Sequence, residues 1–150
     1  MEIIIFVGLP AAGKSTFYRQ HFAATHTLVS KDLLPPRHKQ LRQMEEITRA
    51  LVAGRSVVID NTNSTVADRA VLIELGRAHG ATISGYSLRS TVAASLARNR
   101  QRTGRARVPD IAIYAIAKHL VPPTYGEGFD HLFEVTIADD EGFTVTALAR

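Results

Sequence analysis

The chain has 150 residues, a net charge of +4 and no cysteine. Its length allows one hydrophobic core, and its 45% hydrophobic and 21% charged residues exclude a disordered chain, a collagen and a coiled coil. The lack of cysteine excludes disulfides and thiolate chemistry and predicts a cytoplasmic location, and no apolar run reaches the roughly 20 residues of a membrane helix.

The basic residues are dominated by arginine, with 14 Arg against 4 Lys. Because the guanidinium group binds phosphates through two N–H groups and stacks on bases, this composition favours an anionic or nucleotide partner. An arginine-rich genome would produce the same imbalance, so composition leaves both explanations open. The sequence carries no signal for an oligomeric state.

Strands and helices are expected to alternate along the chain. Residues 3–7 form a continuous apolar run, typical of a strand buried on both faces of a parallel sheet. A helix packed on the sheet is indicated by the spacing of Leu41, Met44, Ile47 and Leu51. In chain order we expect a strand at 3–7, a helix over 13–23, a strand at 27–29, a helix over 41–51 ended by Gly54, a strand at 57–59, a helix over 67–78 ended by Gly80, a strand at 81–88, a helix from 91, a helix over 108–120, and strands at 132–137 and 143–148 joined by a turn at 139–142.

This alternation predicts one α/β domain, with a mainly parallel sheet and helices on both of its faces. In such sheets ligands bind where the strands end at their carboxyl termini. Functional residues are therefore sought directly after each expected strand.

The first strand is followed by Gly8-Leu9-Pro10-Ala11-Ala12-Gly13-Lys14-Ser15, a full match to the P-loop pattern G-x-x-x-x-G-K-[ST]. A glycine turn followed by a surface lysine is the alternative, but the flanking strand and helix favour a P-loop. The backbone at Gly8, Ala11, Ala12 and Gly13 would surround phosphate oxygens, Lys14 would reach the β- and γ-phosphates of ATP, and Ser15 would bind Mg²⁺. Residues 1–150 are thus expected to be a single P-loop NTPase or kinase domain.

Two aspartates follow expected strands at the same edge of the sheet. Asp60 ends the run Val57-Val58-Ile59 and is a candidate Mg²⁺ ligand, or else a cap of the next helix. Asp32 follows the second strand and is a candidate general base, because a kinase gains from a carboxylate that accepts the proton of the attacking hydroxyl. An ordinary loop aspartate is the alternative for Asp32.

Residues 98–107 contain five arginines between two expected helices. This segment, with a lid at about 98–108, could fold over the nucleotide and place an arginine at the γ-phosphate, or it could be a solvated basic helix end. The six histidines show no metal-ligand spacing, so a transition-metal site is not expected.

Several motifs occur in an order that resembles the kinase module of the polynucleotide kinase/phosphatase family, over about residues 3–137. They are Gly8 to Phe17, Asp32, Asp60-Asn61-Thr62-Asn63, Arg98-Asn99 to Arg102 with Val108-Pro109, and Glu127-Gly128-Phe129. The resemblance implies ATP-dependent phosphorylation of the 5′-hydroxyl of DNA or RNA. The roles it implies are ATP and Mg²⁺ binding by Lys14, Ser15 and Thr16, a general base at Asp32, a metal and acceptor region at Asp60, a lid arginine at Arg102, and a weaker lid match at Arg98.

The sequence departs from this family in the acceptor region. Ser30-Lys31 stands where the family commonly has Asn-Arg, and Pro35 replaces an arginine of acceptor recognition, for which Arg37 is a candidate substitute. The D-x-D-x-T sequence of the partner phosphatase is absent. These departures affect the expected acceptor more than the expected kinase activity.

The sequence therefore predicts a P-loop kinase that uses ATP and Mg²⁺, with a nucleic-acid 5′-hydroxyl as the acceptor. A kinase for a small molecule, such as a sugar, a nucleoside or an antibiotic, is the first alternative. An ATP-binding switch without an acceptor is the second, and a base at Asp32 distinguishes either kinase from a switch.

Overall fold

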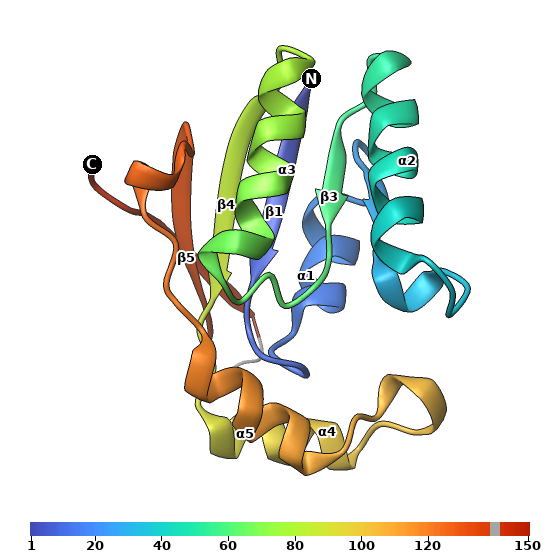
Figure 1. Ribbon diagram of the computed structural model, residues 1–150. Helices are drawn as coiled ribbons and strands as arrows, with labels where there is room; N and C mark the ends of the chain where they lie inside the picture. The colour runs from blue at the N-terminus through green and yellow to red at the C-terminus, as the bar shows by residue number, and fades with distance from the viewer. Residues whose placement is uncertain (139–141) are drawn as a thin grey trace.

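The computed structural model describes residues 1–138 and 142–150 and contains one six-stranded sheet with helices on both faces (Figure 1). The strand order is β2-β3-β1-β4-β5-β6. The first five strands are parallel and β6 pairs antiparallel with β5. Their bounds are β1 (Glu2–Val7), β2 (Thr27–Val29), β3 (Val57–Ile59), β4 (Thr82–Leu88), β5 (His131–Ile137) and β6 (Phe143–Ala147).

Helices α1, α2 and α3 lie along the faces of the sheet, and α4 and α5 lie beyond the end at which β1 and β3 finish (Figure 1). Their bounds are α1 (Lys14–His21), α2 (Lys39–Val52), α3 (Val66–Ala78), α4 (Val92–Arg100) and α5 (Asp110–His119), with short 3-10 turns at Lys31–Leu33, Gly104–Ala106 and Tyr125–Glu127. Among the described residues, none of these helices is both long and apolar enough to cross a membrane. The predicted α/β fold is confirmed.

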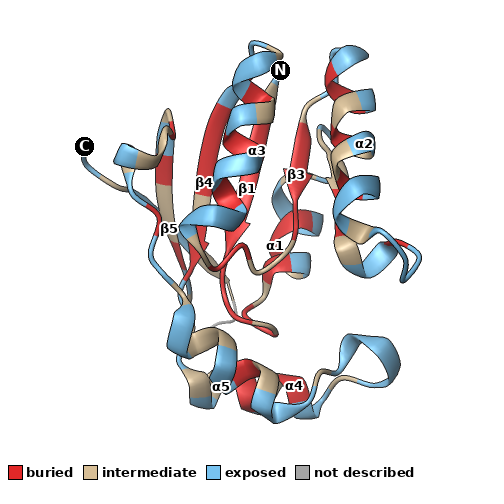
Figure 2. Cartoon of the chain, in the orientation of Figure 1, coloured by how far each residue is buried: buried red, intermediate tan, exposed pale blue. Residues whose placement is uncertain are grey.

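Alternate side chains of β1 point into two separate cores. Ile3 and Ile5 pack with residues of α2 and α3 on one face, whereas Ile4 and Phe6 pack with residues of α1, α4 and α5 on the other. Figure 2 shows the resulting band of buried strands under partly exposed helices. Because both faces of the sheet are covered, the sequence of β1 is a nearly continuous apolar run.

The buried faces of two helices differ from those predicted. Leu41 is 59% exposed on α2, and the polar Gln43 is buried instead. In α3 the apolar Val71 is 39% exposed, and the buried residues are Arg69, Leu72, Ile73 and Gly76. In α3 the reason is electrostatic. Arg69 can be buried because the carboxylate of Glu127 balances its charge.

The predicted ends of α2 and α3 are confirmed. Gly54 and Gly80 adopt left-handed φ angles of +75° and +70°, and the next residue in each case bonds back to a helix carbonyl at 2.9 Å. Glycine is favoured there because side chains disfavour this conformation. The turn predicted at 139–142 falls largely on residues 139–141, which lie outside the described residues.

Candidate active site

The P-loop connects β1 to α1 through a backbone that requires small residues. Gly13 has a φ of +94° and Ala11 a φ of +60°, and both lie in the left-handed region. A Cβ atom on Gly8 would lie 3.0 Å from the carbonyl oxygen of Leu88. Strained backbone of this kind is typical of ligand-binding loops.

The side chain of Lys14 closes this loop from within. Its Nζ donates hydrogen bonds to the carbonyl oxygens of Gly8, at 3.1 Å, and Leu9, at 2.6 Å. Burial lowers the pKa of Lys14 to about 8, while the carboxylate of Asp60 partly offsets this effect. An anion beside this buried ammonium would favour its charged form, so the loop is suited to binding phosphate.

Ser15 and Asp60 form the candidate magnesium site. The Oγ atom of Ser15 donates to Oδ2 of Asp60 at 3.0 Å, and burial raises the pKa of Asp60. The alternative role of Asp60 as a helix cap is wrong, because Thr65 caps α3. No group of three or more metal-ligating side chains occurs in the described part of the chain. A hydroxyl and one carboxylate beside a phosphate site nevertheless fit Mg²⁺, which keeps most of its waters.

The loop after β3 ties together the ends of three neighbouring strands. The Oδ1 atom of Asn61 accepts a hydrogen bond from the backbone N–H of Lys31 at 2.9 Å, after β2. The carbonyl of Thr62 accepts from the N–H of Gly8 at 3.1 Å, after β1. Asn63, which is buried, donates to the carbonyl of Phe6 at 2.8 Å. The motif 60–63 thus fixes the P-loop and the Asp32 loop relative to each other.

Asp32 lies at the start of the segment that follows β2. Its backbone N–H bonds to the Oγ atom of Ser30 at 3.3 Å, and the residue is exposed. Within residues 1–138 and 142–150, no group donates a hydrogen bond to its carboxylate, and no cation lies within ion-pair distance of it. An exposed carboxylate without a partner can accept a proton from a substrate hydroxyl.

Most of the predicted chemistry-bearing side chains line one cavity of about 280 Å³. Of the predicted site residues, it brings together Ala11, Lys14, Ser15, Asp32, Asp60 and Arg102. The others, Gly8, Ala12, Gly13, Thr16 and Arg98, do not line it. The wall also includes Lys31 and Arg105, which the sequence did not single out as site residues.

The segment predicted as a lid is closed at its base by Asn99. This side chain is fully buried, donates to the carbonyl of Val108 at 2.7 Å and accepts from the N–H of Val108 at 3.1 Å. Between these two residues, Arg102 faces the cavity and donates to the carbonyl of Ala106 at 3.3 Å. Asn99 was part of the motif that carried the resemblance, but no role was predicted for it.

Arg98 contacts the P-loop from outside the cavity. One nitrogen of its guanidinium donates to the carbonyl of Ala11 at 3.4 Å and to the Oγ atom of Ser90 at 3.3 Å. Helix α4 is therefore linked to the strained part of the phosphate-binding loop.

A model of the AAA domain family matches residues 3–123 of the chain. The chain belongs to this AAA domain family. The chain is also 31% identical over 140 residues to the bifunctional polynucleotide phosphatase/kinase of Schizosaccharomyces pombe. This match covers 89% of the chain and 33% of that protein. A putative bifunctional polynucleotide phosphatase/kinase of Acanthamoeba polyphaga mimivirus is 31% identical over 147 residues, covering 93% of this chain and 34% of that protein. The chain thus spans about a third of the length of these relatives.

The AAA domain also resembles solved structures in fold. A fungal RNA kinase superposes with a TM-score of 0.69 at 15% identity, covering 90% of this chain and 38% of that one. At this identity the likeness shows the fold alone, which is that of P-loop kinases.

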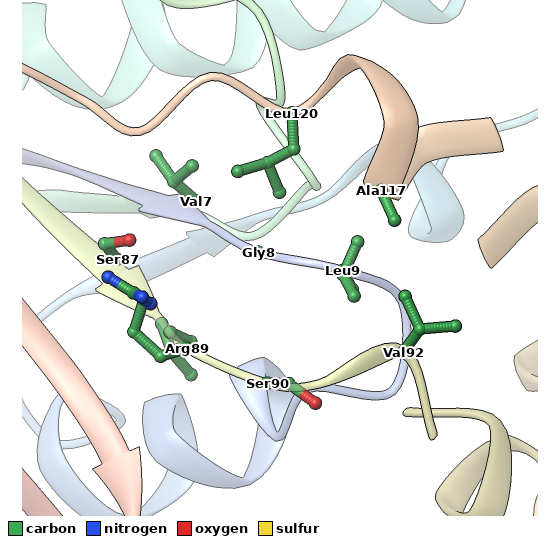
Figure 3. A pocket seen from close by; sticks show the side chains of 10 residues that line it. Val7, Gly8, Leu9, Ser87, Arg89, Ser90, Val92, Ala117 and Leu120 are labelled. Atoms are coloured by element: carbon green, nitrogen blue, oxygen red, sulfur yellow. The ribbon is translucent and has the colours of Figure 1, made fainter. Parts of the chain in front are cut away.

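A smaller cavity of about 170 Å³ lies between the start of the P-loop of this AAA domain and α5 (Figure 3). Figure 3 shows Ala117 and Leu120 beside Val7 and Leu9. Its one charged side chain, Arg89, pairs with Glu134 at 3.3 Å. None of the predicted catalytic residues Lys14, Asp32 and Arg102 lines this smaller cavity.

Proposed function

We propose that the chain is a kinase that transfers the γ-phosphate of ATP to the 5′-hydroxyl of a polynucleotide. The observation that carries the proposal is the position of Asp32. Its carboxylate, without a described partner, lines the same cavity as Lys14 and the Ser15–Asp60 pair. A switch that only binds nucleotide needs no base at this place.

The P-loop residues bind the nucleotide phosphates in this proposal. The backbone N–H groups of the loop and the first turn of α1 surround the phosphate oxygens, with Thr16 on that turn. Lys14 places its ammonium beside the β- and γ-phosphates. Ser15 and Asp60 hold Mg²⁺, which neutralises charge on the phosphates when it is bound.

Asp32 accepts the proton of the acceptor hydroxyl as its oxygen attacks the γ-phosphorus, and the bond from that phosphorus to the leaving ADP oxygen breaks. Arg102, which lines the same cavity, stabilises the charge on the transferred phosphoryl group, with residues 98–108 acting as a lid. Arg98 supports the P-loop through Ala11. Residues 1–150 act as one kinase domain in a cytoplasmic location.

Two features support a polynucleotide as the acceptor. The two relatives at 31% identity are named polynucleotide phosphatase/kinases. The cavity wall carries Lys31 and Arg105 in addition to the side chains that serve ATP, and phosphodiesters are bound by such cations.

Incubation with γ-labelled ATP, Mg²⁺ and a panel of acceptors tests this proposal. We expect label on 5′-hydroxyl DNA or RNA oligonucleotides, none on 5′-phosphorylated controls, and a steep loss of apparent affinity as salt rises. Label only on nucleosides or sugars would contradict the proposal and favour a small-molecule kinase. Release of inorganic phosphate alone would favour an ATP-binding switch.

A further inference from the structure

A cleft of about 330 Å³ opens between α2 and α3 beside the catalytic cavity. Lys31, Asn61 and Thr62 line both spaces and form the boundary between them. Beyond this boundary the cleft is lined by Gln40 from α2 and Asp68 from α3, among others. The cavity that holds Asp32 and the cleft therefore adjoin at these three residues.

The boundary carries a positive charge. Within the described part of the chain, no carbonyl or carboxylate accepts a hydrogen bond from the ammonium of Lys31. Its backbone, in contrast, is fixed by Asn61 at 2.9 Å. The backbone of Lys31 is therefore held in place, while its ammonium is available to bind a phosphate at the boundary between the cavity and the cleft.

The cleft itself suits a nucleobase better than a phosphate. The carboxylate of Asp68 repels phosphate but can accept hydrogen bonds from exocyclic amines, and the amide of Gln40 can pair with a base edge. Gln43 is buried and oriented by Asn61, whose Nδ2 donates to its Oε1 at 2.5 Å. Val71, 39% exposed, adds apolar surface for the face of a ring.

We infer that this cleft binds the nucleobase of the acceptor's second nucleotide, with Lys31 on the phosphodiester that joins the first two nucleotides. The inference rests on the proposed function, because it takes the 5′-hydroxyl of the first nucleotide to lie at Asp32. One phosphodiester separates successive nucleosides. A cation at the boundary therefore places the next nucleoside beyond it.

Single-stranded 5′-hydroxyl oligonucleotides with one abasic site test this assignment on the full chain. We expect an abasic site at the second position to raise KM for the strand about five- to tenfold, and one at the third position to change it little. In the Asp68→Ala and Gln40→Ala variants this difference should shrink, since the hydrogen-bonding groups that face the base are removed. Glu74→Gln, an exposed carboxylate on the same helix, is the matched control and should keep the difference.

Lys31 is tested by salt. The Lys31→Ala variant should weaken strand binding and reduce the slope of log affinity against log salt by about one, whereas Lys118→Ala on α5 should not. Equal KM values for abasic sites at the second and third positions, or an Asp68→Ala variant that behaves like Glu74→Gln, would overturn the cleft assignment while the kinase proposal stands. Failure to label any oligonucleotide would overturn both.

Discussion

Arg69 and Glu127 form a buried two-pronged ion pair between α3 and the segment that follows α5. Nε and Nη2 of Arg69 bond the two carboxylate oxygens of Glu127 at 2.7 and 3.0 Å, and neither side chain is more than 8% exposed. Nη1 of Arg69 also bonds the carbonyls of Asn63 and Val121, both at 2.9 Å. The pair thus connects the loop after β3 to the segment that follows α5.

Breaking this pair should destabilise the fold strongly. Glu127→Gln would leave the buried guanidinium of Arg69 without its counter-charge, which costs about 3 to 5 kcal/mol of unfolding free energy. The exposed pair of Arg89 and Glu134 is the control, and Glu134→Gln should cost less than about 1 kcal/mol. Urea unfolding of both variants measures the difference. Equal losses of unfolding free energy in the two variants would show that the buried pair contributes no more to stability than the exposed pair.

The base of the lid should open when Asn99 is changed. Asn99→Ala removes both the N–H donor to the carbonyl of Val108 and the oxygen that accepts the N–H of Val108, so neither hydrogen bond can form. We expect faster amide hydrogen exchange at Val108 and reduced turnover, with the β1 amides still protected. Unchanged exchange at Val108 would refute the proposed closure.

Substitutions of the lid arginines should differ in their effect on turnover, depending on whether the arginine lines the cavity. Arg102 lines the cavity, so Arg102→Ala should lower turnover much more than it raises the Michaelis constant for ATP, and Arg102→Lys should rescue only part of the loss. Arg107→Ala, outside the cavity lining, should be mild. The turnover number and the Michaelis constant for ATP, measured for the three variants by steady-state kinetics, test this prediction. A near wild-type Arg102→Ala would move the role to another arginine of the segment.

Asp130 should contribute a pH-dependent part of the stability. The backbone N–H of Ile83, at 2.8 Å, and then the guanidinium of Arg77 lower the pKa of Asp130 below its ordinary value. A lowered carboxyl pKa stabilises the fold above the unfolded-state pKa, and this contribution is lost as pH falls through the folded-state pKa. Asp130→Asn should therefore be less stable than wild type at neutral pH, and the difference in unfolding free energy should narrow as pH falls below the ordinary carboxyl pKa. A gap independent of pH would argue against this origin.

The fold could be predicted because its signals are local. The apolar run of β1 and the glycine-rich turn after it define a strand, a phosphate loop and a helix within a short stretch of chain. Burial in α2 and α3 depends on partners far along the chain and was predicted less well. Arg69 shares a helical face with Leu72, Ile73 and Gly76, and this spacing was the available signal that it is buried.

The catalytic cavity was predictable at the residues that lie in the loops directly after the parallel strands. Lys14, Asp32 and Asp60 meet in one cavity because parallel strands end at the same edge of the sheet. The supporting contacts of Asn99 could not be predicted, because its partner Val108 lies across the lid. The same applies to Asn61, whose contacts to Lys31 and Gln43 depend on strand order.

Phosphoryl transfer by an Asp32→Asn variant tests the central claim most directly. The amide keeps the shape of the carboxylate but cannot take the proton of the acceptor. We therefore predict that transfer from γ-labelled ATP to a 5′-hydroxyl oligonucleotide falls by about 10²- to 10⁴-fold, while the calorimetric affinity for ATP stays near wild type. Transfer at the wild-type rate, or a parallel loss of ATP affinity, would contradict the assignment of Asp32 as the base of a polynucleotide kinase.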